Sequence, residues 1–244
     1  MVSTPVQQPS TRLDEPLSFN LPMESSVHEQ QASMFAGCIR RLWKDKTDWF
    51  LAVNLTLFYF DKSGKRRWCG PDLFLVKGVE SQDHNSWTIA PEEGTPPSWI
   101  LELVSPSSKS RRKDKVDNKT LYQNLGVNEY FWFDIDVESS RRRLAGFRLV
   151  DGFYETIEPD ERGYLWSEEL GLFLGLQGRW LRLFTADGEL VPTPIEAEEI
   201  AQQQSQQESD RAERERQGRL EAESRAAQLA ARLQELGIDP DELG

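Results

Sequence analysis

The stretch "SWILELVSPSS", residues 98–108, places one acidic side chain inside an otherwise apolar segment. Its neighbours predict a buried strand, because a short apolar run that ends at Ser-Pro is typical of a strand covered on both faces. Glu102 stands in the middle of that run. An unpaired carboxylate in a protein interior costs several kcal/mol, so the chain must supply Glu102 with a partner, a shifted pKa or a metal ion.

Helical and strand patterns alternate on both sides of this stretch. The predicted order is a helix at 27–43, strands at 49–60, 70–79 and 99–104, a helix at 113–124 and a strand at 129–135. Gly126 is the predicted stop of the second helix. Four shorter runs predict strands that cover or extend the sheet, at 143–150, 153–157, 171–177 and 179–184. We therefore expect an α/β protein whose core has the order α-β-β-β-α-β.

The ends of the chain differ in composition from the middle. Residues 1–20 are polar and without periodicity, which predicts a flexible leader before a domain at 21–194. Residues 195–244 contain 13 acidic residues and 6 arginines, so this tail carries most of the net charge of -12. A sparse leucine stripe predicts a long exposed helix, with a homodimer through a coiled coil as one hypothesis and a low-complexity tether as the other.

The hydropathy, cysteine count and net charge of the chain narrow the class of protein. No apolar run approaches the ~20 residues that cross a bilayer, and the N-terminus lacks the apolar region of a signal peptide. Cys38 and Cys69 are too few for a disulfide framework and lack zinc-type spacing. We expect a cytoplasmic protein without a membrane partner. The acidic balance argues against broad attraction to nucleic acid, although the charge is unevenly spread.

A second carboxylate is predicted near Glu102. Asp72 follows the turn formed by Gly70 and Pro71, at the mouth of the strand that precedes the Glu102 strand. If the two strands are neighbours, their carboxylates repel unless a divalent cation such as Mg²⁺ lies between them. Asp72 could also be a simple turn residue, and Glu102 could be neutralised by an ion pair with Lys119 or Arg112.

These residues resemble a known family. Pro71-Asp72, "ILELVSPSS" and "KDKVDNKTLYQNLGVNEYFWFDID" are similar to the Uma-type restriction endonucleases, members of the PD-(D/E)XK nuclease superfamily, over residues 21 to about 184. The resemblance implies a restriction-endonuclease-like fold, with a mixed central sheet flanked by helices. It also implies endonuclease activity on DNA, with Asp72 and Glu102 as ligands of Mg²⁺ or Mn²⁺.

The resemblance implies further residues and has one gap. Val104 stands where the superfamily pattern has a lysine. In Uma-type sequences that lysine comes from the following helix, which implies Lys119 as the group that holds or activates water, with Lys115 as an additional candidate. Many relatives carry two adjacent lysines there, and this chain has Asn118 before Lys119. In the family pattern the first helix often carries a Glu and, one turn on, a His, which implies Glu24 as a third acidic group and gives His28 a lower rank. Glu24 could also be an exposed first-turn residue that is favourable to the helix dipole.

Two alternatives remain open at this stage. A nuclease-fold protein that binds or regulates without cutting is favoured by Val104 and Asn118 and disfavoured by the retained acidic pair. The basic run 109–115 could steer a phosphate backbone or could be an ordinary solvated loop.

Overall fold

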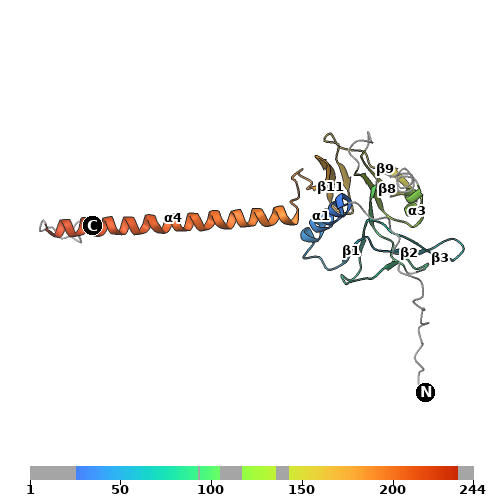
Figure 1. The fold of residues 1–244 in the computed structure, drawn as a ribbon, viewed down its shortest axis with the longest axis horizontal. Coiled ribbons are helices and arrows are strands. Elements are labelled where there is room, and N and C mark those ends of the chain that lie inside the picture. Colours follow the sequence, from blue (N-terminus) through green and yellow to red (C-terminus); the bar gives the residue numbers. More distant parts are fainter. Residues whose placement is uncertain (1–25, 93, 105–116, 136–142, 236–244) are drawn as a thin grey trace, which may run out of the picture.

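The computed structural model describes residues 26–92, 94–104, 117–135 and 143–235. A six-stranded mixed sheet forms its centre, in the order β1-β4-β6-β7-β8-β9 (Figure 1). Its strands are β1 (Trp49–Val53), β4 (Leu73–Lys77), β6 (Trp99–Val104), β7 (Glu129–Asp134), β8 (Leu144–Val150) and β9 (Phe153–Thr156). Two helices flank it, α1 (Ser26–Leu42) and α3 (Asn118–Asn124). The α/β class and the order α1, β1, β4, β6, α3, β7 are as predicted.

One parallel pair organises the sheet. β6 and β7 run parallel in full register, and all other neighbours in this sheet are antiparallel. A parallel pair cannot be closed by a short turn, so the chain crosses over through the segment that contains α3. Gly126 follows the end of α3 within that crossover. It has a φ of 78°, a left-handed conformation that glycine adopts readily, and its amide donates to the Gln123 carbonyl.

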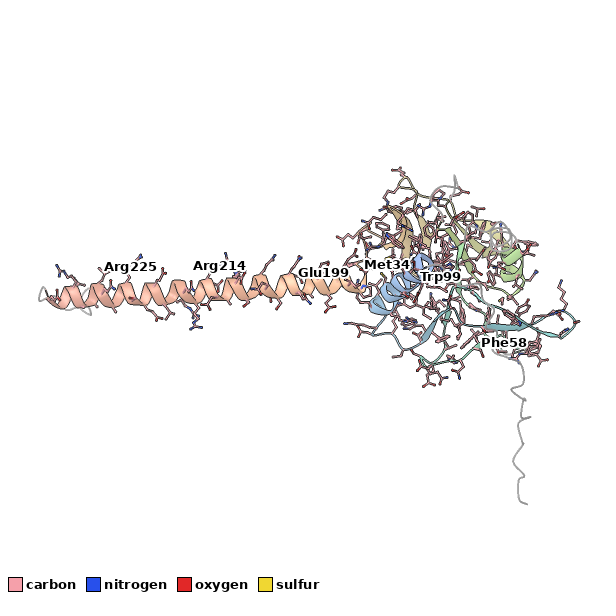
Figure 2. All side chains as sticks on the ribbon, in the orientation of Figure 1. Met34, Phe58, Trp99, Glu199, Arg214 and Arg225 are labelled. Atoms are coloured by element: carbon pink, nitrogen blue, oxygen red, sulfur yellow. The ribbon has the colours of Figure 1, made fainter. Side chains whose placement is uncertain are left out.

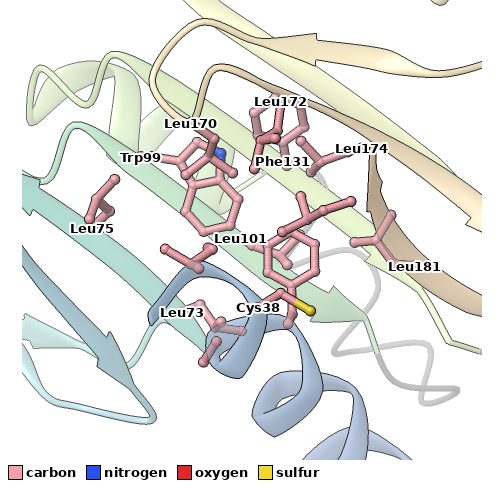
Figure 3. Packing of buried hydrophobic residues seen from close by; sticks show 14 of the residues in the cluster. Cys38, Leu73, Leu75, Trp99, Leu101, Phe131, Leu170, Leu172, Leu174 and Leu181 are labelled. Atoms are coloured by element: carbon pink, nitrogen blue, oxygen red, sulfur yellow. The ribbon is translucent and has the colours of Figure 1, made fainter. Parts of the chain in front are cut away.

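The central strands are covered on both faces, which is why they are almost wholly apolar. One face packs against α1 and a three-stranded sheet of β10 (Leu165–Ser167), β11 (Leu172–Gln177) and β12 (Trp180–Phe184). Figure 3 shows Leu101 and Phe131 of the central sheet gathered with Leu174 and Leu181 of this second sheet. The opposite face packs against α3 through Ile100, Val104 and Tyr122. Residues of β6 alternate between the two cores.

The predicted strand at 49–60 is wrong in one respect, because the chain turns in its middle. Asn54 has a φ of 51°, which breaks the ladder. The second half becomes β2 (Leu57–Phe60), which belongs to a separate sheet with β3 (Arg66–Cys69) and the short β5 (Trp87–Thr88). β3, β5 and β10 were not predicted from the sequence.

The tail is a single helix, α4 (Pro194–Glu235), that runs away from the domain (Figure 1). A capping box starts it: the Glu196 amide donates to Thr193 Oγ1, and the Thr193 amide donates to the Glu196 carboxylate. Gly37 of α1 leaves room for this start, since a Cβ there would meet Pro194 Cγ at 2.8 Å. Within the described ranges, no helix is long and apolar enough to cross a bilayer.

Candidate functional site

Two acidic residues meet where β4 begins and β6 ends. β4 and β6 are antiparallel, and Leu73 lies opposite Leu101, so one further step of the register puts Asp72 opposite Glu102. The Asp72 backbone amide lies 3.4 Å from Glu102 Oε2 and donates to it. Both residues are buried, with 9% and 4% of their surface exposed. Positions 72 and 102 are therefore paired on adjacent strands, through a contact between the Asp72 amide and the Glu102 carboxylate.

Glu102 accepts hydrogen bonds from α3. The Tyr122 hydroxyl donates to Glu102 Oε1 at 2.5 Å, and Asn118 Nδ2 donates to the same oxygen at 2.9 Å. Burial and the negative charge of Glu102 hold the pKa of Tyr122 well above its usual value of 10, so the hydroxyl stays protonated and can donate. These donors offset part of the cost of burying the Glu102 carboxylate.

Asp72 is held from the opposite side of the sheet. His28 Nε2, on α1, lies 2.9 Å from Asp72 Oδ1, and the ring donates because a carboxylate can only accept. The Leu103 amide donates to Asp72 Oδ2 at 2.6 Å. The acidic pair is thus fixed by α1 on one face of the sheet and by α3 on the other.

Lys119 lies away from this group. Its Nζ stands 3.8 Å from the centroid of the Phe147 ring on β8, and burial lowers its pKa from the usual 10.5. Phe147 pairs with Tyr130, which pairs with Ile100, so Phe147 is two strands across and two residues along from Glu102. That offset is roughly 12 Å between backbones. Asn118, rather than Lys119, occupies the face of α3 that meets Glu102.

Other predicted residues lie outside the described part of the chain. Glu24 precedes α1, and Lys115 and Arg112 fall in the basic run after β6. Sequence reasoning ranked His28 low and gave Tyr122 no role. The signal for Tyr122 was its spacing of four residues from Asn118, which puts both side chains on one helix face.

The two carboxylates suit a small, hard cation. Mg²⁺ in proteins is commonly held by one or two carboxylates, with water and substrate phosphates completing its shell. Among the described residues, no group of three or more His, Cys, Asp and Glu side chains converges to form a fuller cage. Asp72 and Glu102 could hold such an ion if water and a substrate phosphate completed its shell.

A mixed sheet with paired acids on adjacent strands, flanked by α1 and α3, defines an α/β fold of the restriction-endonuclease-like class. Residues 18–185 match the Uma2 family, described as "Putative restriction endonuclease", and the chain belongs to that family. Among solved structures it is similar to "a putative nuclease belonging to DUF820" from Anabaena variabilis ATCC 29413, with 16% identity and a TM-score of 0.43, over 61% of this chain and 76% of that one. No curated protein matches the chain.

Proposed function

We propose that the protein is an endonuclease that hydrolyses phosphodiester bonds in DNA with Mg²⁺ or Mn²⁺ as its metal. The family description supports a nuclease, and the single observation that carries the proposal is the buried pair of Asp72 and Glu102 in register on adjacent strands. Two acidic side chains buried at paired positions of neighbouring strands favour a metal site, because a cation offsets the cost of burying their charge.

The residues around the pair would position it. Asp72 and Glu102 would hold the ion, which when bound lowers the pKa of an attacking water and neutralises charge that develops on the phosphate. Tyr122 and Asn118 fix the orientation of Glu102, and His28 fixes that of Asp72. Fixed carboxylates need no reorganisation when the reaction occurs.

The first test is cutting of supercoiled plasmid DNA with Mg²⁺ or Mn²⁺ and with a chelator. Wild type should cut only with metal, and Asp72→Asn and Glu102→Gln should lose at least about a thousandfold in rate, which corresponds to about 4 kcal/mol. Asp151→Asn is the matched control, because Asp151 is exposed and asparagine tolerates its φ of 49°. Isothermal titration calorimetry should show metal binding by wild type and the control only. Cutting by both carboxylate variants would contradict the proposal.

A second candidate is a nuclease-fold protein that binds DNA without cutting it. Two observations favour it: buried Val104 stands at the usual lysine position, and the Lys119 ammonium contacts Phe147. Measuring plasmid cutting by Lys119→Met and by Lys115→Met tests whether either lysine takes part in catalysis. Loss of cutting in one variant alone assigns the lysine that aids the water. Absence of cutting by wild type, with DNA binding retained, would favour the second candidate.

A further inference from the structure

A basic hairpin projects from the domain on the side away from α4 (Figure 1). β2 and β3 pair in antiparallel register, and every residue from Lys62 to Trp68 is exposed. The hairpin contains one acidic residue, Asp61, and four basic ones, Lys62, Lys65, Arg66 and Arg67. This excess of positive charge lies on a chain whose net charge is -12.

One face of the hairpin combines cations with aromatic rings. Phe58 pairs with Trp68, and Phe60 pairs with Arg66, so these four side chains share a face. The Arg66 guanidinium stands 3.8 Å from the centroid of the ring of Phe58, the hairpin residue that Figure 2 labels. Trp68 is 51% exposed, although large aromatic side chains are usually mostly buried. Proteins that bind single-stranded nucleic acid combine positive charge with exposed aromatic rings in this way, and on a duplex the same exposed ring can contact the groove or the sugar.

The tip of the hairpin is held in one shape before any ligand arrives. Asp61 accepts hydrogen bonds from the amides of Ser63 and Lys65 and from Arg67 Nε, at 2.9, 3.1 and 2.8 Å. Gly64 takes a φ of 78° at the turn. Arg67 is thus paired with Asp61, whereas Lys62 and Lys65 are exposed cations and Arg66, also exposed, lies over the Phe58 ring.

The base of the hairpin adjoins the acidic pair. β3 ends at Cys69, only three residues before Asp72, and the Asn54 amide before β2 donates to the Asp72 carbonyl at 2.8 Å. Three residues of extended chain span at most about 11 Å, and the eight residues from Gly64 to Asp72 at most about 29 Å. That reach corresponds to about 8 base pairs along a duplex, at 3.4 Å for each step of one strand.

We infer that the β2–β3 hairpin is the arm that holds duplex DNA beside the acidic pair, an inference that rests on the proposed function and names its binding surface. The major groove of B-form DNA admits a two-stranded β-ribbon, whereas the deep, narrow groove of an RNA duplex does not. Charged residues on an edge strand can also serve only to prevent sheet-to-sheet pairing. That simpler role explains the cations of β3 but not its exposed tryptophan or its place three residues from Asp72.

The test measures fluorescence anisotropy of a labelled 20-base-pair DNA duplex with a chelator present, from 50 to 200 mM salt. The triple variant Lys62→Gln, Lys65→Gln, Arg66→Gln should bind at least tenfold more weakly at 100 mM salt. Its slope of log K against log salt should flatten by about 2 to 3, since each phosphate contact contributes about 0.9. Trp68→Ala should weaken binding severalfold without changing the slope. An RNA duplex should bind more weakly than DNA to wild type.

The matched control removes three charges from α4, in Arg211→Gln, Arg214→Gln, Arg216→Gln. These arginines are exposed on the helix that runs away from the domain, and Figure 2 labels Arg214 there. The control should bind DNA within twofold of wild type. Circular dichroism should show unchanged folding of both triple variants, and Arg66→Glu alone provides a second, smaller perturbation that should also weaken binding.

The outcomes separate this inference from the proposed function. If the hairpin variants bind DNA as tightly as wild type with the same salt slope, the inference is wrong, even where wild type cuts DNA. Equal weakening by the α4 control, or equal binding of DNA and RNA duplexes, also overturns it. If binding depends on the hairpin while neither wild type nor Asp72→Asn cuts, the inference stands and the proposed catalysis fails. Cutting lost in Asp72→Asn with hairpin-dependent binding retained supports both.

Discussion

Glu102 shows how hydrogen bonds accommodate an acidic side chain that is buried within a strand. The side chain sits between Ile100 and Val104 on the face of β6 that α3 covers. Hydrogen bonds from Tyr122, Asn118 and the Asp72 amide replace part of its hydration. The sequence left three ways to accommodate Glu102: a hydrogen-bonding partner, a shifted pKa or a metal ion. The structure establishes the hydrogen-bonding partners. The metal remains a proposal.

Tyr122→Phe tests the strongest of these bonds. At pH 7 the free energy of unfolding of the variant should be lower than that of wild type by about 1.5 to 3 kcal/mol, because the Glu102 carboxylate loses the hydrogen bond that the Tyr122 hydroxyl donates. Burial raises the folded pKa of Tyr122 above the unfolded value of 10. This contribution to stability is therefore complete below pH 10 and is lost as the pH rises toward the folded pKa. Urea denaturation from pH 7 to 11 should show wild type losing more stability than Tyr122→Phe above pH 10.

Tyr154→Phe is the matched control for that experiment. Burial also raises the pKa of Tyr154, whose hydroxyl donates to the Val127 carbonyl, so this variant should likewise flatten the alkaline loss of stability. It should leave DNA cutting unchanged, since Tyr154 does not touch the acidic pair. A stability difference between wild type and Tyr122→Phe that stays constant from pH 7 to 11 would contradict the linkage.

At the scale of elements, a further buried acidic residue, Glu129, joins the two sheets that face each other. Glu129, at the start of β7, is 1% exposed and accepts hydrogen bonds from Arg148 of β8 and from Ser167 Oγ of β10. It also accepts from the amides of Glu168 and Glu169. This cluster fixes the end of β10 against the central sheet, and its role is structural because it contains a cation that already balances the charge.

Glu129→Gln should lower the free energy of unfolding by about 2 to 3 kcal/mol, less than for a fully buried ion pair because the Arg148 side chain is 28% exposed. Urea denaturation measures it. Glu168→Gln is the control: Glu168 also pairs with Arg148, but its side chain is 62% exposed, so its loss should cost under about 1 kcal/mol. An equal loss of unfolding free energy in the two variants would show that burial does not decide how strongly each glutamate interacts with Arg148.

At the scale of the whole molecule, α4 is the feature that the domain does not explain. Its 42 residues correspond to about 63 Å of helix, and almost all of them are exposed. Near its end, Ala222, Ala226, Leu229 and Leu233 follow the spacing of four, three and four residues that forms a coiled-coil seam. We expect a second copy of the chain to pack against this seam, and dimerisation through it stays a prediction.

Light scattering coupled to gel filtration tests that prediction. Full-length protein should have the mass of a dimer, and a chain ending at Pro194 the mass of a monomer. Leu229→Gln together with Leu233→Gln should weaken the dimer, whereas Leu220→Gln should not, because Leu220 is equally exposed but lies off the seam. A monomer at full length would leave α4 as a tether.

The sequence alone determined the α/β class and the order of the main helices and strands, and it offered the long C-terminal helix as one of two hypotheses. Each of these depends on local pattern: apolar runs, helical spacing, and turns at Gly-Pro and Ser-Pro. Tertiary structure decided where Asn54 divides a run into two sheets and which face of α3 meets Glu102. It also decided that His28 reaches Asp72 across 44 residues of chain. Those outcomes depend on helix rotation and on packing between distant segments, and a local pattern of residues does not specify either.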